Sequence, residues 1–387
     1  MADRWTEELV LKRTDDRAVG TSVYIVKGEA AILRLQELLV RFSERCGNAS
    51  STLLDLPYFL QKPGLLKRSP CLFLVANRSG VPVETLLPED LTGSALLLEY
   101  RVWRLGTRAY ATNDRSGSGT LLSQPQDRMR VAALICGLLL NRGAKVVLMS
   151  FGDAPVHEQS QGSPAFQRRN RFVSGVRWSM RRRQVPVYLS LQPTLDETLA
   201  GLGQKTRSNM RYYRRRAEKD LGCVLVPHGQ VQLDEVFHFN KACMYPVSDD
   251  ILRWRLKVLD ALHSPFVMGL KDRDGQWLSV LGGRRFGDTA EILWQMNRDG
   301  FPSHSLGTVM RSYCIEEEVK RASRRLQVEG GTYHSMHHSF VHEEVIDLVV
   351  TAPGATKILR RLVDRFIPAE NSLAQMLKHD EQQWHDT

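Results

Sequence analysis

The sequence predicts a mixed α/β protein made of two tandem units, and three observations support this. Its 387 residues exceed what one hydrophobic core normally supports, which favours two domains. Its content of 42% hydrophobic and 25% charged residues is typical of a globular protein. Each half of the chain also shows the same order of patterns: antiparallel strands, a loop, a helix and a final strand. We therefore expect mixed sheets flanked by helices in both units.

The first half begins with a helical pattern from Glu29 to Arg45. A second helix is expected from about Pro125 to Arg142, and a Gly/Ser-rich loop, Arg115–Thr120, precedes it. The strands of this half are expected at Cys71–Ala76, Ala95–Leu105, Arg108–Thr112 and Lys145–Met149.

The second half begins with three helical patterns, near 195–221, 232–243 and 249–263. A hairpin turn is expected at Asp272–Gly275, and a helix that follows the loop after Asn297 ends near Arg325. The strands of this half are expected at Phe266–Lys271, Trp277–Arg284, Thr289–Asn297 and Leu326–Glu329. A last amphipathic stretch runs from Thr351 to Phe366.

The two units are expected to join through a basic surface segment. No aspartate or glutamate occurs from Gln159 to Leu195, while arginine is frequent there. Such a composition suits a loop better than a core. The predicted organisation is a first unit over 1–159, a basic inter-domain segment over 160–185 and a second unit over 186–387.

Charge and cysteine content limit the possible partners and compartments. The formal net charge of +10 favours an anionic partner, such as nucleic acid, an acidic membrane surface, a nucleotide or a diphosphate-bearing substrate. The six cysteines form no C-x-x-C pair, which argues against a zinc knuckle or a redox motif, and we expect reduced, mostly buried thiols. The longest apolar run, Val131–Leu140, is too short to span a membrane. We expect a cytoplasmic protein, with peripheral membrane contact left open.

Residues 202–221 separate into two stripes on a helix. One face is apolar, and beside it several arginines share an edge. An anchored basic edge suits the binding of an anion, although a solvated amphipathic helix explains the same pattern. The apolar face contains Leu202, Met210, Tyr213, Ala217 and Leu221, and the edge contains Arg207, Arg211, Arg214 and Arg215.

Three segments carry a resemblance to a known family. These are KTRSNMRYYRRRAEKDLG from Lys205, ILWQMNRDGFPSHSLGTVMRSYCIEEEVKRA from Ile292, and VEGGTYHSMHHSF from Val328. They resemble the signature regions of the CelD-like branch of GNAT-type N-acyltransferases, which are relatives of the Fem-type transferases. The resemblance covers about residues 190–345 and implies two fused GNAT-like units, the C-terminal one better preserved.

The resemblance also implies roles for residues, with some departures. The family's Thr-Arg pair, which holds an anionic part of a substrate, corresponds to Thr206 and Arg207. Where the family has a Tyr-Lys pair, this chain has Met336 and His337, so a lysine has become a histidine. The predicted substrate-binding residues are Lys205, Thr206, Arg207, Arg211 and Arg214.

In GNAT-like units the donor diphosphate binds the N-terminus of a helix, where backbone N–H groups and the helix dipole attract anions. The matching segment here is His304–Thr308, although it lacks a full R/Q-x-x-G-x-G/A signature and has Ser305-Leu306-Gly307 in place of a Ser-Pro-Gly-like turn. The loop Arg115–Thr120 is a rival donor site. The predicted residues for an acyl-CoA co-substrate are Arg298, His304, Ser305, Gly307 and Thr308.

Acid–base candidates gather near the last predicted strand. A histidine there could accept the proton of an acceptor amine, although each could equally be structural. Glu291 and Glu329 are carboxylate candidates, with arginine-paired rim carboxylates as the alternative. Tyr313 could protonate a leaving thiolate, or it could be a core residue. The predicted catalytic residues are His334, His337, Glu291, Glu329 and Tyr313, and no metal is expected because no acidic ligand is interleaved among the histidines.

Three functions remain open from the sequence. The first is an N-acyltransferase that moves an acyl group from acyl-CoA to an amine on an anionic acceptor, such as a sugar- or lipid-linked envelope precursor. The second is a Fem-type transferase that uses aminoacyl-tRNA, with the arginines as the phosphate-binding surface. The third is a nucleic-acid-binding protein without catalysis, although the sequence contains no recognisable nucleic-acid-binding motif.

Overall fold

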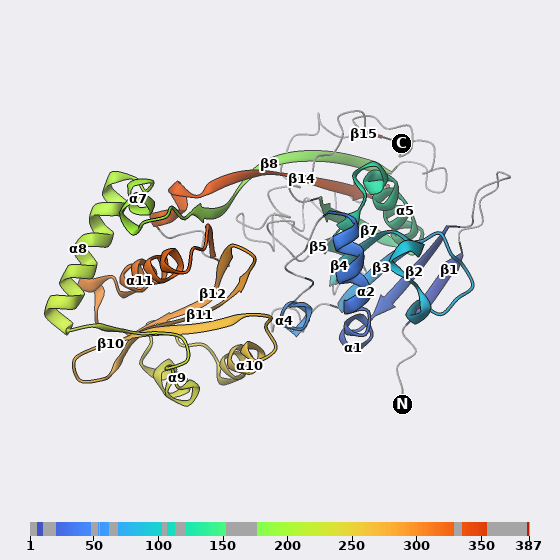
Figure 1. Cartoon of the computed structure of the whole chain (residues 1–387). Coiled ribbons are helices and arrows are strands. Elements are labelled where there is room, and N and C mark those ends of the chain that lie inside the picture. The colour runs from blue at the N-terminus through green and yellow to red at the C-terminus, as the bar shows by residue number, and fades with distance from the viewer. Residues whose placement is uncertain are drawn as a thin grey trace. The chain divides into compact units, whose positions relative to one another are not determined.

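A computed structural model of the chain describes residues 6–10, 21–47, 53, 55–61, 69–102, 107–112, 121–151, 176–328, 335–353 and 385–386. The chain forms two compact units (Figure 1). The first contains Met1–Val185 and Glu344–Thr387, and the second contains Pro186–Glu343. The chain therefore returns to the first unit at its end, where the sequence had placed 186–387 in the second.

The first unit is built on one mixed sheet with helices on both faces. Its strand order is β1-β2-β3-β4-β5-β7-β14, antiparallel except for the parallel pair β5–β7, and β6 pairs with β4. The strands are β1 Thr6–Val10, β2 Ser22–Lys27, β3 Ser69–Ala76, β4 Leu91–Val102, β5 Thr107–Thr112, β6 Leu121–Ser123, β7 Ala144–Ser150 and β14 Val341–Thr351.

Alternate strand residues of this sheet enter two cores. Helix α5 (Arg128–Asn141) covers one face, and helices α1 (Glu29–Leu33), α2 (Gln36–Arg45) and α4 (Leu56–Gln61) belong to the core on the other. The expected helix from Glu29 to Arg45 is thus present as two helices. Strands that are apolar on both faces are typical of a sheet buried between helical layers.

The second unit repeats this plan. Its sheet has the order β8-β13-β12-β11-β10-β9, and only β12–β13 is parallel. The strands are β8 Arg177–Ser190, which enters this unit at Pro186, β9 Val224–Val226, β10 Pro265–Lys271, β11 Trp277–Phe286, β12 Thr289–Asn297 and β13 Arg325–Val328. The expected strands of this half are confirmed to within a few residues.

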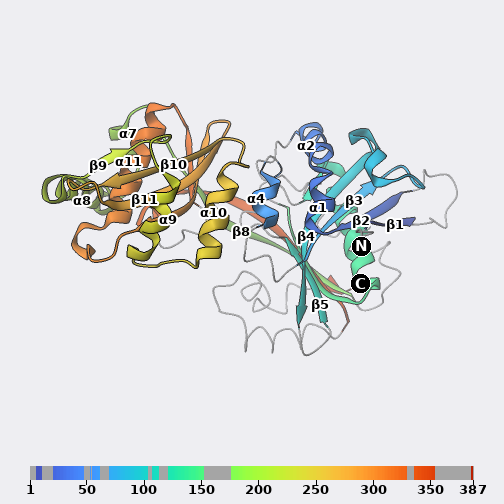
Figure 2. The same ribbon diagram turned by 90° about the horizontal axis from the view of Figure 1, so that it is seen from below.

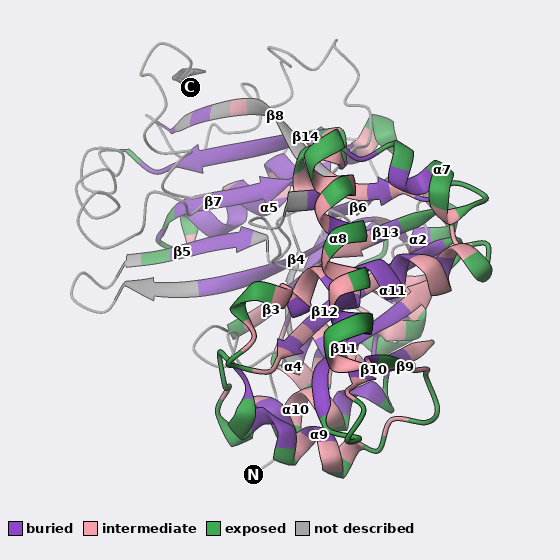
Figure 3. Ribbon diagram, turned by 90° about the vertical axis from the view of Figure 1, so that its left-hand side faces the viewer, coloured by how far each residue is buried: buried purple, intermediate pink, exposed green. Residues whose placement is uncertain are grey.

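Helices cover both faces of this second sheet, as Figures 1 and 2 show. Three of them, α7 (Leu195–Ala200), α8 (Gln204–Leu221) and α11 (Leu306–Lys320), lie on one face, and α9 (Leu233–Phe239) and α10 (Asp249–Leu259) lie on the other. The long helix expected over 195–221 is interrupted by Gly201–Gly203. Figure 3 shows that α8 is exposed along its outer side.

Two expectations about the connection between the units need correction. The predicted inter-domain segment 160–185 becomes strand β8 from Arg177 onward, and 160–175 lie outside the described residues. The amphipathic stretch expected from Thr351 falls on the end of β14, whose residues Asp347–Thr351 pair with β7 of the first unit. Its remaining positions from 354 onward are outside the described residues.

All six cysteines are free, and all but Cys46 are buried, as expected. Within the described ranges, every helix is too short or too polar to cross a membrane.

Candidate active site

Strand β12 contains a bulge opposite two glycines of β11. Gly283 pairs with Ile292 and Gly282 pairs with Trp294, so Leu293 has no counterpart. One extra residue in one strand of a pair is a β-bulge, and it bends the strand and increases its twist. Among the described residues, the parallel pairing with β13 ends at the same point, because Ile292 is the last residue of β12 with a partner there.

Beyond the bulge, the edge of β12 that faces β13 has no partner strand among the described residues over several positions. The next described partner on this edge is Met244, whose N–H donates to the carbonyl of Asn297 at 2.9 Å. From Ile292 to Asn297 the strand spans about 16 Å. Over this length no strand of the described ranges covers the edge. An open edge of this kind can hydrogen-bond an extended ligand through its backbone.

The bulge also changes which side chains face α11. Before it, Ala290 and Ile292 belong to the core under the helix, and after it, Gln295 and Asn297 face the helix. The Nε2 of Gln295 donates to the carbonyl of Gly307 at 3.2 Å and to Oδ1 of Asn297 at 2.9 Å. The hydroxyl of Ser279 on β11 donates to the same Oδ1 at 2.8 Å. Three polar side chains are thus fixed beneath the first turn of α11.

The first turn of α11 presents backbone N–H groups. Its N-terminal cap, Ser305, adopts φ 46° and ψ 54°, a left-handed conformation that non-glycine residues adopt only at some energetic cost. The N–H groups of Thr308 and Val309 donate to the carbonyl of Ser305 at 2.8 and 3.1 Å. Those of Leu306 and Gly307 have no acceptor among the described residues. A left-handed residue followed by helical ones forms a concave anion site, which the helix dipole reinforces.

Gly307 leaves room for the polar side chains below it. A Cβ added at this position would lie 3.3 Å from Nδ2 of Asn297 and 3.6 Å from Nε2 of Gln295. This glycine therefore lets the helix approach the strand at the turn whose N–H groups have no acceptor among the described residues. Of the predicted donor residues, the structure brings together Ser305, Gly307 and Thr308.

The other two residues predicted to bind acyl-CoA contact other residues of the chain. His304 lies with Nε2 3.4 Å from Oδ2 of Asp220, at the end of α8. Arg298 follows β12, and its Nη1 donates to the carbonyl of Trp277 at 3.4 Å. Both flank the start of α11 along the chain. The rival loop Arg115–Thr120 lies outside the described residues.

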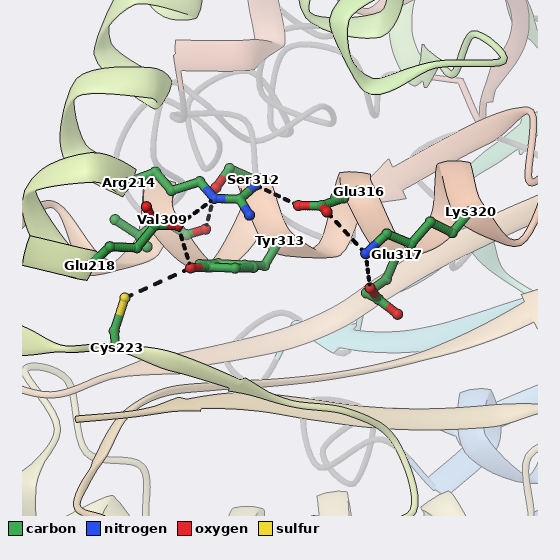
Figure 4. A network of polar contacts seen from close by, with 9 residues as sticks. All are labelled: Arg214, Glu218, Cys223, Val309, Ser312, Tyr313, Glu316, Glu317 and Lys320. Carbon is green, nitrogen blue, oxygen red and sulfur yellow. Dashed lines mark hydrogen bonds and ion pairs between the residues drawn. The ribbon is translucent and has the colours of Figure 1, made fainter. Parts of the chain in front are cut away.

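Tyr313 joins α11 to α8, as Figure 4 shows. Its hydroxyl donates to Oε1 of Glu218 at 2.7 Å, and the guanidinium of Arg214 lies 3.9 Å from its ring centroid. Arg214 in turn lies 2.6 Å from Oε2 of Glu316. Burial and the hydrogen bond to Glu218 raise the pKa of Tyr313. Its proton is held on the oxygen, and this geometry suits helix packing better than donation to a thiolate.

Replacing Tyr313 by phenylalanine tests this interpretation. The change removes one hydrogen bond to a carboxylate, so we expect the free energy of unfolding to fall by about 1–2 kcal/mol. We expect the acyl-transfer activity that the sequence predicts to change by less than about threefold, because the hydroxyl takes no part in proton transfer in this interpretation. Urea denaturation and steady-state kinetics measure the two effects. A large loss of kcat with unchanged stability would instead assign Tyr313 to catalysis.

The predicted substrate-binding residues follow α8 in two groups. Arg211 lies 2.7 Å from Oδ1 of Asp196, and Arg214 belongs to the contact with α11, so both have carboxylate partners. Lys205, Thr206 and Arg207 lie in the first turn. The predicted apolar face is confirmed, with Leu202, Met210 and Ala217 buried and Tyr213 and Leu221 packed against the same core.

The first turn of α8 and the first turn of α11 lie at opposite ends of the pair of helices. Asp220, near the end of α8, contacts His304, which precedes α11. From Arg207 to Asp220, helix α8 rises about 20 Å. The predicted donor residues and the cationic residues Lys205 and Arg207 therefore occupy separate ends of α8.

His337 lies near the start of α8. It belongs to the 3₁₀ helix Ser335–Ser339, and the hydroxyl of Ser339 accepts the N–H of Gly203 at 3.3 Å. The ring centroids of His338 and His342 are 6.2 and 6.5 Å from that of His337. Burial, and then the charges of these two neighbours, lower the pKa of His337. The neutral imidazole can accept a proton.

The remaining catalytic predictions do not join this arrangement. Glu291 lies on the opposite face of the sheet from Ala290 and Ile292, because strand residues alternate, and its carboxylate lies 2.8 Å from Nε of Arg284. Glu291 thus matches the alternative given for it, a carboxylate paired with an arginine, and the arginine is buried. Glu329 and His334 lie outside the described residues. Among the described residues, no cluster of histidine, cysteine or acidic side chains is arranged to hold a metal.

The sequence analysis missed the amide pair under α11. Gln295 and Asn297 alternate with apolar residues after Leu293, which is the pattern of one polar face of a strand. Ser279 joins them from β11. The Oε1 atom of Gln295 is buried and accepts no hydrogen bond from the described residues. Polar residues repeating at every second position within a buried strand were the available signal.

Comparison with known proteins bears on the fold. No protein-family model and no curated protein matches the sequence. The solved structure of FemX matches with a TM-score of 0.51 at 10% identity, over 81% of this chain and 95% of FemX. The chain shares its fold with FemX. The predicted mixed α/β fold in two tandem units is confirmed, and at this identity the likeness concerns the fold alone.

Two further solved structures match with lower scores. One is L-PGS from Bacillus licheniformis, with a TM-score of 0.47 at 11% identity over 86% of this chain and 96% of that one. The other is a tandem GNAT protein from the clavulanic acid biosynthesis pathway, solved without AcCoA, with a TM-score of 0.43 at 12% identity over 89% and 98% of the two chains.

Proposed function

We propose that this protein is a GNAT-type N-acyltransferase of the CelD-like branch, which moves an acyl group from acyl-CoA to an amine on an anionic acceptor. One observation carries the proposal. The first turn of α11, where the N–H groups of Leu306 and Gly307 have no acceptor among the described residues, lies beside the part of β12 after the bulge at Leu293, which has no partner strand among them. A phosphate site next to an open strand edge suits a ligand with a diphosphate and an amide-containing arm.

The residues present fit such a donor. Gly307 provides a surface that a Cβ would fill, and the left-handed Ser305 directs the following N–H groups to one side. The unsatisfied Oε1 of Gln295 can accept a hydrogen bond from the donor. The acyl-CoA would therefore bind along β12 with its diphosphate at the start of α11.

The acceptor is proposed to bind near the first turn of α8. Lys205 is exposed and Arg207 is half-buried there, and neither has an acidic partner within the described ranges. His337 lies at the same end through the contact of Ser339 with Gly203. An anionic acceptor, such as a sugar- or lipid-linked precursor, matches the two cations. The predicted cytoplasmic location remains a proposal.

The chemistry needs little beyond positioning and one proton acceptor. The acceptor amine attacks the thioester carbonyl, a C–N bond forms and the C–S bond breaks. The amine loses one proton and the leaving thiolate gains one, so the reaction is balanced. We assign the acceptance of the amine proton to the neutral imidazole of His337.

This assignment predicts a pH dependence. Because burial lowers the pKa of His337 below its usual 6.5, the imidazole is neutral at pH 7 and is protonated only as the pH falls further. We expect kcat/KM to be level above that value and to decline below it. His337→Ala should lower kcat by about 100-fold and remove the decline. The exposed His263 provides the control variant, His263→Ala. Full activity in both His337→Ala and His334→Ala would dispose of a histidine base.

A second function is favoured by the outer face of α8. Lys205, Arg215 and Lys219 are exposed on it, and Tyr212 is 51% exposed between them. Cations around an exposed aromatic ring suit a nucleic-acid backbone. This supports the alternative of a transferase that uses aminoacyl-tRNA.

Calorimetry separates the two donors. The purified protein is titrated with acetyl-CoA, a long-chain acyl-CoA and tRNA at two salt concentrations. We expect micromolar binding of an acyl-CoA that survives the higher salt. Binding of tRNA alone, with a steep loss at the higher salt, would replace the first proposal with the second.

A further inference from the structure

Among the described residues of the second unit, Arg311 on α11 is a cation without an acidic partner. Its Nε is buried and donates no hydrogen bond, and no ion pair or hydrogen bond to it occurs among the described residues. Burial lowers the pKa of its guanidinium. Cations in protein interiors are normally paired, because removing a charge from water is costly. Its neighbour on the same helix face, Glu318, shows the usual arrangement, with Arg285 at 2.7 Å.

No carboxylate of α8 or α11 pairs with Arg311, because each of them pairs with another cation. Those on α8 and α11 are paired as follows: Glu218 and Glu316 with Arg214, Glu317 with Lys320, Glu318 with Arg285, and Asp220 with Arg216. A positive charge is thus left over on the inner side of α11.

The position of Arg311 follows from the contacts of its helix. Gly307, one turn earlier, lies against Asn297 and Gln295, and Glu318, two turns later, bonds Arg285 of β11. Residues four and seven apart share one helix face, so Arg311 belongs to the face that meets the sheet. It lies about 6 Å along the axis from Gly307, above the bulged part of β12.

Side chains on a helix point towards its N-terminus, so an arginine at position 311 can reach the first turn of α11. The two N–H groups without described acceptors, those of Leu306 and Gly307, lie in that turn. The one titratable side chain that flanks this turn in sequence, His304, contacts Asp220 instead. Arg311 is therefore the cation available to an anion bound there.

We propose that Arg311 binds the diphosphate of the donor, together with the N–H groups of Leu306 and Gly307. The inference rests on the proposed function, in which the donor carries a diphosphate. A guanidinium presents two parallel N–H donors to phosphate oxygens, which a backbone site alone does not provide. Binding of the diphosphate neutralises the positive charge of the Arg311 guanidinium. The site therefore selects the donor by its phosphates.

The test uses Arg311→Met, which keeps an unbranched apolar side chain and removes the charge, and Arg311→Lys. The matched control is Arg253→Met on α10, where the arginine is exposed and pairs with Asp250. Two probes, inorganic pyrophosphate and coenzyme A, are titrated by calorimetry, and thermal denaturation is recorded without ligand. We expect Arg311→Met to weaken both probes by roughly 10- to 100-fold, with Arg311→Lys in between.

The melting temperature separates a binding role from a structural one. A partly buried charge without a protein partner contributes nothing favourable to the free protein, so Arg311→Met should melt at the same temperature as the native protein or higher. A lower melting temperature with unchanged affinity for both probes would overturn the inference. Wild-type protein that binds neither probe would overturn it as well.

The same data distinguish failure of the inference from failure of the proposed function. If the native protein binds pyrophosphate through Arg311 but not coenzyme A, the anion site stands and the acyl-CoA donor is wrong. If coenzyme A binds the native protein and Arg311→Met equally well, the donor stands and the role of Arg311 is wrong.

Discussion

Replacing Gly307 by aspartate is expected to abolish donor binding. A Cβ at this position would lie 3.3 Å from Nδ2 of Asn297, and the new carboxylate would sit in the first turn of α11. There the carboxylate would accept hydrogen bonds from the N–H groups that lack an acceptor among the described residues, and its charge would repel a diphosphate. We expect the affinity for acyl-CoA to fall by roughly 1,000-fold or more, as measured by calorimetry. The helix itself should persist, since acidic side chains are favourable in a first helical turn.

The control for this prediction is the rival loop. Gly117→Asp makes the same change in the Gly/Ser-rich segment Arg115–Thr120, and we expect unchanged donor affinity. Circular dichroism of both variants shows whether the fold is kept. If Gly117→Asp loses acyl-CoA and Gly307→Asp retains it, the donor binds the first unit and the site at α11 is wrong. If both variants bind normally, the diphosphate assignment is wrong at both places.

The sequence was sufficient for the elements around the site because their patterns are strong. The expected strand Thr289–Asn297 has the same bounds in the structure, and the hairpin at Asp272–Gly275 joins β10 to β11. Strand β8 was missed because Arg181, Arg182 and Arg183 obscure the alternation of apolar residues that follows them. The break at Gly201–Gly203 was overlooked because the apolar face continues across it.

The bulge is difficult to predict because Ile292, Leu293 and Trp294 form an uninterrupted apolar run. A change of phase within such a run leaves no trace in a pattern of alternation. The only signal lies on the neighbouring strand, where Gly282 and Gly283 stand side by side. Without the bulge, Gln295 and Asn297 would face away from α11, so the site depends on a feature that the sequence shows indirectly.

The side chains that carry charge were the hardest to assign. Whether an arginine is free depends on the carboxylates that the fold brings to it. Arg214 was expected to bind substrate, yet it is held between Glu218 and Glu316. Arg311 carried no sequence signal at all, and its lack of a partner among the described residues emerges only when the partners of its neighbours are known.

Replacing Gly283 by alanine should damage both stability and the site. The added Cβ would lie 2.2 Å from the carbonyl oxygen of Glu291 and 2.4 Å from Cζ of Phe266. Phe266 can move only by disturbing the core, and the carbonyl belongs to the adjacent strand, so β11 and β12 must separate next to the bulge. We expect the free energy of unfolding to fall by about 3–4 kcal/mol in urea denaturation. Donor affinity should fall as well, because the amides of Gln295 and Asn297 depend on the same register.

Gly203→Ala is the matched control for this change. Its added Cβ would meet nothing within 4 Å, and Gly203 has φ −55°, which alanine adopts without strain. At this helix cap the substitution should alter stability by less than about 1 kcal/mol. Equal stability of the two variants would mean that β11 and β12 are not packed as described at Gly283. In that case the bulge at Leu293 would not turn Gln295 and Asn297 towards α11 as described.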